Sequence, residues 1–168
     1  PSLGRGKPNW NPAALDQAVA TAGRAGLQVY IHAIGDRGVR MALDAHEFAR
    51  KALGRTDARG RIEHIETISP ADYPRFRALG VIASMQTSHA PFSVNEGDVW
   101  LARTGEQRWG RSFAWRDIKN AGARLALGSD WTVAPFDPMR FGARAADIEW
   151  LRQQVSRVVS SGYRSHNR

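Results

Sequence analysis

The sequence contains no cysteine, so disulfide bonds and thiolate metal ligands are excluded. It has no apolar run near the ~20 residues that a membrane-spanning helix needs. No basic segment followed by an apolar one, which would be typical of a signal peptide, opens the chain. We therefore expect a soluble cytoplasmic protein without a membrane partner.

Lysine is also scarce, because 21 of the 24 basic residues are arginine, and the formal net charge is +8. The arginines are scattered along the chain, with no basic block and no alternation with aromatic residues. Apolar residues (42%) and charged residues (24%) occur at ordinary globular levels. Nucleic acid is therefore not an expected partner, and a basic binding module is the least favoured class of function.

The common nucleotide-binding and serine-nucleophile motifs are missing as well. There is no G-x-G-x-x-G, no G-x-x-x-x-G-K-[ST] and no G-x-S-x-G. The sequence thus offers no sign of a dinucleotide site, a P-loop or a serine hydrolase.

What is present is an alternation of short apolar strands with helices. Asn11-Pro12 predicts a helix start, Asp36 is the predicted N-cap of a second helix, and Ser69 opens a predicted capping box whose helix ends near Gly80. A further helix is expected over residues 113–121. The predicted strands are residues 27–33, 61–65, 81–86 and 124–127. This order indicates an α/β fold with a parallel sheet, and the long segment 87–110 reads as an irregular, functional loop.

Residues that can bind a metal or a substrate lie at or just after the carboxyl end of each predicted strand. They are His32, His64, Gln86 with His89, and Asp130. Because the carboxyl ends of parallel strands meet at one edge of a sheet, these side chains should converge. Imidazoles and a carboxylate at one point can hold a divalent metal, which activates water near neutral pH.

Each of these residues also has a purely structural interpretation. A single His at a strand end is more often a hydrogen-bonded structural residue, and an Asp before a helix is more often a cap. Four such positions in consecutive βα units favour the shared site. His46 lies on an apolar helix stripe and is predicted to be a core or interface residue, and Glu63 should point toward the helix layer by strand alternation.

Four segments together resemble the family-3 amidohydrolases of the metal-dependent amidohydrolase superfamily, and they are similar to proteins of the N-substituted formamide deformylase kind. They are Ile31-His32-Ala33-Ile34-Gly35-Asp36, Arg61-Ile62-Glu63-His64, Ala83-Ser84-Met85-Gln86 with His89, and Leu127-Gly128-Ser129-Asp130-Trp131. The resemblance covers residues 15–139 and implies about four βα units, the C-terminal half of a TIM-type (β/α)8 barrel.

The resemblance also implies roles for these residues. His32, His64 and Asp130 would bind a divalent metal, usually zinc, with one or two ions in the complete enzyme. Asp130 would be the catalytic general base toward the attacking water. Residues on the substrate side would be His89, Gln86, Arg111 and Trp131. The substrate would be a small molecule with an amide-like C–N bond other than a peptide bond.

The sequence departs from the family at both ends. The His-x-His pair that opens the family's first strand is absent. The 168 residues, with four predicted strands, also fall short of the eight strands and ~250 residues of a complete barrel. We therefore expect a fragment with a partial barrel domain at residues 1–139 and a divergent, Arg-rich helical tail at 140–168.

The missing N-terminal barrel half is the expected partner of such a fragment, and a homo-oligomer is an alternative. The half barrel should expose an apolar inner face that includes Ile31, Ile62 and Leu125. The chain is then either a metal hydrolase when complemented or a non-catalytic truncated remnant.

Overall fold

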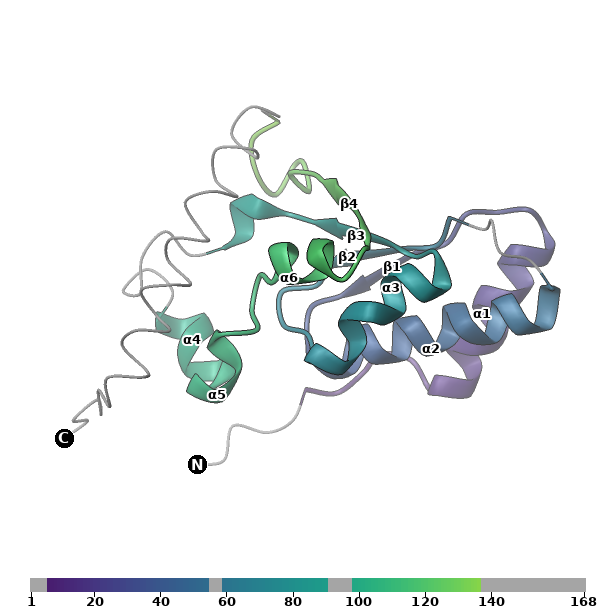
Figure 1. Cartoon of the computed structure of the whole chain (residues 1–168), viewed down its shortest axis with the longest axis horizontal. Helices are drawn as coiled ribbons and strands as arrows, with labels where there is room; N and C mark the ends of the chain where they lie inside the picture. Colours follow the sequence, from purple (N-terminus) through teal and green to yellow (C-terminus); the bar gives the residue numbers. More distant parts are fainter. Residues whose placement is uncertain (1–5, 55–58, 91–97, 137–168) are drawn as a thin grey trace.

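The computed structural model describes residues 6–54, 59–90 and 98–136. Strands alternate with helices along the chain (Figure 1), as the sequence predicts. The elements are α1 (Pro12–Arg24), β1 (Tyr30–Ala33), α2 (Asp36–Leu53), β2 (Arg61–His64), the 3-10 helix η1 (Pro70–Asp72), α3 (Tyr73–Leu79), β3 (Ile82–Met85), the 3-10 helix η2 (Thr87–His89), α4 (Asp98–Thr104), α5 (Glu106–Trp109), α6 (Trp115–Asn120) and β4 (Arg124–Leu127).

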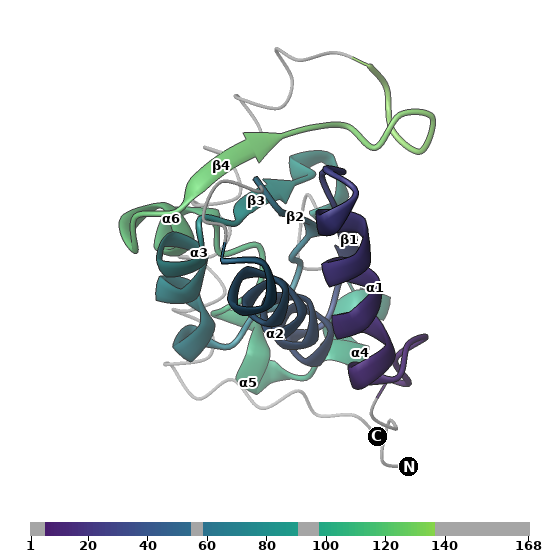
Figure 2. The same cartoon turned by 90° about the vertical axis from the view of Figure 1, so that its right-hand side faces the viewer.

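The four strands form one parallel sheet in the order β1-β2-β3-β4. Tyr30 pairs with Arg61, and Arg61 in turn pairs with Ile82, so the strands start nearly level. Helices α1, α2, α3 and α6 lie on one side of this sheet, whereas α4 and α5 lie beyond one of its ends (Figures 1 and 2). The prediction of an α/β fold with a parallel sheet is therefore confirmed.

The hydrophobic core lies between the sheet and this helix layer. Ile62, Ala83 and Met85 point from β2 and β3 into it and are fully buried, together with Leu43 of α2 and Ile118 of α6. A second cluster joins α1 to α2. Among the described residues, no helix is both long and apolar enough to cross a membrane.

The face of the sheet opposite the helices carries other residues than the sequence predicts. Ile62 is fully buried in the helix-side core, and Ile31 and Leu125 pack against the same cluster, so none of the three belongs to an uncovered inner face. Strand alternation instead puts Tyr30 and Arg61 on the face opposite the helices, with the Arg61 guanidinium 4.4 Å from the centre of the Tyr30 ring. We call this the uncovered face, because no described helix packs on it. This face is more polar than the sequence pattern indicated.

Two signals at helix ends are confirmed. The Asn11 side chain accepts a hydrogen bond from the backbone N–H of Ala13 at 3.0 Å, and Pro12 is the first residue of α1. Gly80 follows α3 with φ +71°, a left-handed conformation that glycine adopts without a steric penalty.

Two capping predictions were wrong. Gly35 is the N-cap of α2, and Asp36 is already the first helical residue. Ser69 makes no side-chain capping bond. The capping box fails because its carboxylate, Asp72, is buried and pairs with Arg40 at 2.8 Å, so a tertiary ion pair replaces the local bond.

The segment predicted as an irregular loop, residues 87–110, contains η2, α4 and α5. The next helix, expected from residue 113, begins only at Trp115, because Phe113 has φ +49°. The first strand begins at Tyr30 rather than at residue 27. The predicted tail, 140–168, lies outside the described residues.

Candidate metal centre

Four candidate side chains meet at the carboxyl ends of the strands. The rings of His32 and His64 have their centroids 4.3 Å apart, and those of His64 and His89 are 5.5 Å apart. The Nε2 atom of His89 lies 3.9 Å from Oδ2 of Asp130. The structure therefore brings together the residues that the sequence singled out on all four βα units.

His64 reaches this cluster through an unusual backbone conformation. Alternation after Ile62 would turn its side chain toward the helix layer, but His64 has φ +74° and Ile65 has φ +54°. The Ile65 N–H donates to the carbonyl of Ala33 at 3.0 Å and fixes this turn. Left-handed residues other than glycine cost on the order of 1 kcal/mol and are concentrated at functional sites. Asp130, with φ +58°, shares this feature.

The donor atoms fit a divalent metal. One ligand atom each from His64, His89 and Asp130 lies within 4.8 Å of the other two. The Nδ1 atom of His64 and the Nε2 atom of His89 are buried and have no hydrogen-bond partner among the described residues. Buried polar atoms without a partner are rare, and two imidazole nitrogens with one carboxylate suit zinc. This group shares two residues with the predicted ligand set and has His89 in place of His32.

The electrostatics of His64 favour the form that binds metal. Burial lowers the pKa of His64, the imidazole of His32 lowers it further, and Asp130 acts in the opposite direction. A neutral ring at neutral pH leaves a lone pair available, which metal binding requires.

Glu63 was predicted to face the helix layer, and this prediction was wrong. It lies on the uncovered face and forms an ion pair with Arg61, its neighbour two residues back on the same strand. Gln86 is buried, and the amide N–H of its Nε2 donates a hydrogen bond to the Glu63 carboxylate at 2.9 Å. Burial alone would raise the pKa of Glu63, but hydrogen bonds from Arg61, Ser84 and Gln86 outweigh it, so the pKa is lowered.

The two remaining predicted substrate-side residues lie in different settings. Arg111 donates to the Asp36 carboxylate at 3.1 Å and to the carbonyl of Ile68 at 3.3 Å, so it ties the segment after α5 to the start of α2. Trp131 is 69% exposed next to Asp130. Their substrate-binding roles stay predictions.

Sequence reasoning missed Glu66 and Trp100. Glu66 is buried just after β2, and its Oε2 accepts a hydrogen bond from the Trp100 indole at 2.9 Å. Its Oε1 lies 3.8 Å from Nδ1 of His89. Burial raises the pKa of Glu66, while Trp100 and His89 oppose this effect. An acidic residue two positions after His64 was a usable signal, but nothing in the sequence pointed to Trp100.

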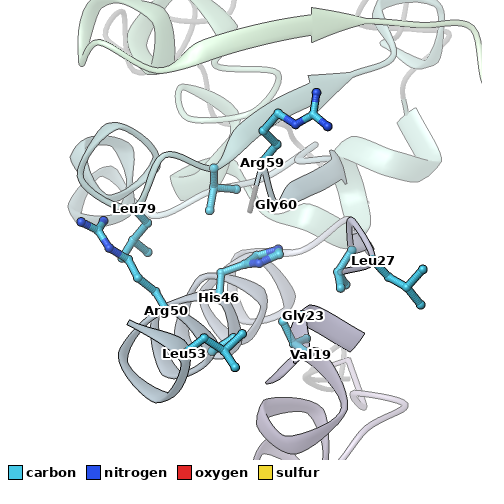
Figure 3. A pocket seen from close by; sticks show the side chains of 12 residues that line it. Val19, Gly23, Leu27, His46, Arg50, Leu53, Arg59, Gly60 and Leu79 are labelled. Atoms are coloured by element: carbon cyan, nitrogen blue, oxygen red, sulfur yellow. The ribbon is translucent and has the colours of Figure 1, made fainter. Parts of the chain in front are cut away.

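His46 lies far from this cluster and is a core residue, as predicted. A pocket of about 40 Å³ surrounds it, lined in part by Gly60 and Val81, which directly precede β2 and β3. Figure 3 shows the His46 side chain at the centre of this pocket, extending from α2 toward Gly60. The pocket is therefore at the amino ends of the strands, opposite the metal-binding cluster.

Curated relatives cover most of this chain. It is 38% identical over 130 residues to Protein LONG AFTER FAR-RED 3 of Arabidopsis thaliana, which corresponds to 77% of this chain and 22% of that protein. It is 29% identical over 126 residues to the putative amidohydrolase YtcJ of Bacillus subtilis, or 74% of this chain and 22% of that protein. The chain thus spans about a fifth of the length of these relatives.

Solved structures share its fold. An uncharacterized metal-dependent hydrolase from Pyrococcus furiosus has a TM-score of 0.63 at 24% identity, over 89% of this chain and 33% of that chain. An uncharacterized metal-dependent hydrolase from Pyrococcus horikoshii OT3 has a TM-score of 0.67 at 26% identity, over 89% of this chain and 30% of that chain. The amidohydrolase family model matches residues 3–161. The predicted domain boundary after residue 139 falls within this range but outside the described residues, and it stays a prediction. Because the match covers nearly the whole sequence, the chain belongs to the amidohydrolase family.

Proposed function

We propose that this chain supplies the C-terminal barrel half of a metal-dependent hydrolase that cleaves C–N bonds other than peptide bonds. The observation that carries the proposal is the group formed by His64, His89 and Asp130 at the carboxyl ends of parallel strands. In parallel α/β folds this edge is where active sites lie. Family membership and the metal-dependent hydrolases with the same fold support the reaction class.

Zinc is the proposed metal, with His64 and Asp130 as ligands. The rings of His32 and His89 both lie near that of His64, with centroid distances of 4.3 and 5.5 Å, so either imidazole can complete a set of three. When bound, a divalent cation acts as a Lewis acid that makes water nucleophilic near neutral pH. Three protein ligands plus an open position are typical of catalytic zinc sites.

Asp130 is the proposed general base. Its side chain is 42% exposed, so a water molecule can reach the carboxylate from solvent. The carboxylate can accept a proton from this water and pass it to the leaving nitrogen. The His89 imidazole, 3.9 Å from Oδ2, restricts where the carboxylate lies.

Complementation is part of the proposal, because the chain spans only about a fifth of the length of its curated relatives. Its sequence lacks the His-x-His pair. Within the described residues, β1 and β4 each pair on one side only. The alternative is a non-catalytic remnant of such an enzyme, which the turnover assay below distinguishes.

The test measures zinc binding and turnover separately. The purified chain is titrated with zinc by calorimetry, with His64→Ala as the test variant. The control is His166→Ala, at a position to which the sequence assigns no role. Binding that is lost only in His64→Ala supports the site, whereas no binding to a folded chain contradicts it.

Turnover of N-acyl and N-formyl amines is then assayed for the chain alone and after mixing with the N-terminal barrel segment of a full-length family member. Activity only on mixing supports the fragment hypothesis. Robust turnover by the isolated chain would contradict that hypothesis, and zinc binding without activity in any mixture would favour the remnant.

A further inference from the structure

A buried carboxylate connects the metal-binding cluster to a distant helix. The side chain of Glu66 has one oxygen, Oε2, bonded to the indole N–H of Trp100 at 2.9 Å. The other oxygen, Oε1, faces the Nδ1 atom of His89 at 3.8 Å. On the far side of the same ring, Nε2 is buried and lies 3.9 Å from Asp130, and no group in the described part of the chain forms a hydrogen bond with it.

The contacts around Glu66 fix which oxygen faces which partner. Trp100 packs against the hydrophobic core, with its ring 5.2 Å from that of Phe113. The backbone N–H of Phe113 donates to the carbonyl of Glu66 at 2.8 Å. An indole can only donate, so it occupies Oε2 and leaves Oε1 facing the imidazole.

A neutral imidazole carries its proton on one nitrogen, and its partners decide which one. The Glu66 carboxylate lies 3.8 Å from Nδ1 and is nearly buried, whereas the Asp130 carboxylate, 3.9 Å from Nε2, is 42% exposed. The charge of Glu66 is therefore less screened by solvent, and it favours the proton on Nδ1. We propose that Glu66, held by Trp100, is a positioning residue that keeps the proton of His89 on Nδ1 and leaves the Nε2 lone pair directed into the metal-binding cluster. Carboxylates beside metal-binding histidines act in this way in many sites. The inference rests on the proposed function, because the tautomer matters only if this cluster binds a metal.

Glu66→Gln provides a sharp test, because the amide has only one acceptor oxygen. The Trp100 indole N–H still needs an acceptor, so the amide oxygen should face Trp100 and the NH2 group should face His89. The NH2 group can only donate, which requires an unprotonated Nδ1 and moves the ring proton to Nε2. Adding Trp100→Phe removes the indole N–H, and the amide can then rotate so that its oxygen faces Nδ1 again.

The tautomer can be measured on the full chain without metal, by long-range ¹H–¹⁵N correlation spectra of ¹⁵N-histidine-labelled protein at about pH 8, where free imidazoles are neutral. We expect the Nδ1–H form of His89 in the wild type, the Nε2–H form in Glu66→Gln and the Nδ1–H form again in the double variant. Glu47→Gln, on α2 and paired with Lys51, is the matched control and should leave the tautomer unchanged.

Zinc titration gives a second readout. Affinity should fall roughly 10- to 100-fold in Glu66→Gln and recover in the double variant. The same tautomer in all variants, or an Nε2–H form already in the wild type, would overturn the inference even if zinc binds. If the tautomer pattern holds but no variant binds zinc, the inference survives and the proposed function fails. If Glu66→Gln does not fold, the tautomer of His89 in the wild type decides: the Nδ1–H form supports the inference and the Nε2–H form overturns it.

Discussion

Lowering the pH from about 7.5 to about 4 should destabilise the fold through the buried imidazole of His46. This residue is only 8% exposed, and no hydrogen-bond partner of its Nε2 atom is found within residues 6–54, 59–90 and 98–136. Burial lowers the pKa of His46 from its ordinary value of 6.5 to about 4, although a hydrogen bond with the backbone of Arg61 acts in the opposite direction. Among the described residues, no acidic side chain lines the pocket to stabilise a charged ring.

The magnitude follows from linkage between protonation and folding. The unfolded chain binds a proton at His46 below pH 6.5, whereas the folded chain does so only below about pH 4. The contribution of the neutral His46 ring to the free energy of unfolding is therefore complete above pH 6.5, decreases between pH 6.5 and about 4, and is lost below that. At 1.36 kcal/mol per pKa unit, the loss is about 3 kcal/mol.

The assay is urea unfolding at several pH values, for the wild type and for His46→Leu, which has a similar volume and no titrating group. Other groups titrate in both proteins, so the difference between their free energies of unfolding isolates His46. This difference should change by about 3 kcal/mol between pH 7.5 and 4, in favour of the variant at low pH. Parallel pH profiles would refute the reasoning.

Three further predictions concern the site and the packing of the pocket. In a complemented enzyme, Asp130→Asn should lower kcat roughly 10²- to 10⁴-fold while zinc stays bound, because an amide cannot accept the proton from water. His89→Ala should lower the zinc affinity of the chain at least roughly tenfold and more than His32→Ala does, as calorimetry can measure, because His89 belongs to the compact ligand group. Gly60→Ala should cost about 1–3 kcal/mol in urea unfolding, because the added Cβ would lie 2.4 Å from the ring of His46.

Each of these predictions has a matched control or a contrary result. Asp16→Asn, on α1 away from the strand ends, should leave turnover unchanged. Gly110→Ala meets no atom within 4 Å and should leave stability nearly unchanged. Near wild-type turnover of Asp130→Asn would exclude the general-base role. A larger effect of His32→Ala on zinc affinity would restore the ligand set that the family resemblance implies.

The strands were predictable because each is a short apolar run between turn residues. The fourth, residues 124–127, was predicted to the residue, and the others within three residues at each end. Helices α4 and α5 were not predictable, since segment 87–110 carries no regular apolar stripe that would indicate a helix. Trp100 packs against the core and donates to Glu66, so tertiary contacts hold α4 in place.

Positions at the strand ends were predictable, but the directions of the side chains were not. Strict alternation places His64 and Glu63 on opposite faces of the sheet, and the prediction wrongly turned Glu63 toward the helices. The positive φ of His64 returns its ring to the side of His32, and no residue type in the sequence signals that change. The tie between Glu66 and His89 likewise depends on a contact between segments that follow different strands.

The polar character of the uncovered sheet face changes what an incomplete barrel would expose. In the middle of that face Glu63 is bonded to Arg61, Gln86 and Ser84, so its charge and hydrogen-bonding groups are satisfied within the sheet. The large exposed apolar side chains of the sheet lie on its outer strands instead, with Tyr30 54% exposed on β1 and Leu127 43% exposed on β4. Unpaired strand edges are the sites at which further strands add. Association with the rest of a barrel, or with a second copy, should therefore begin along β1 and β4 rather than across the face.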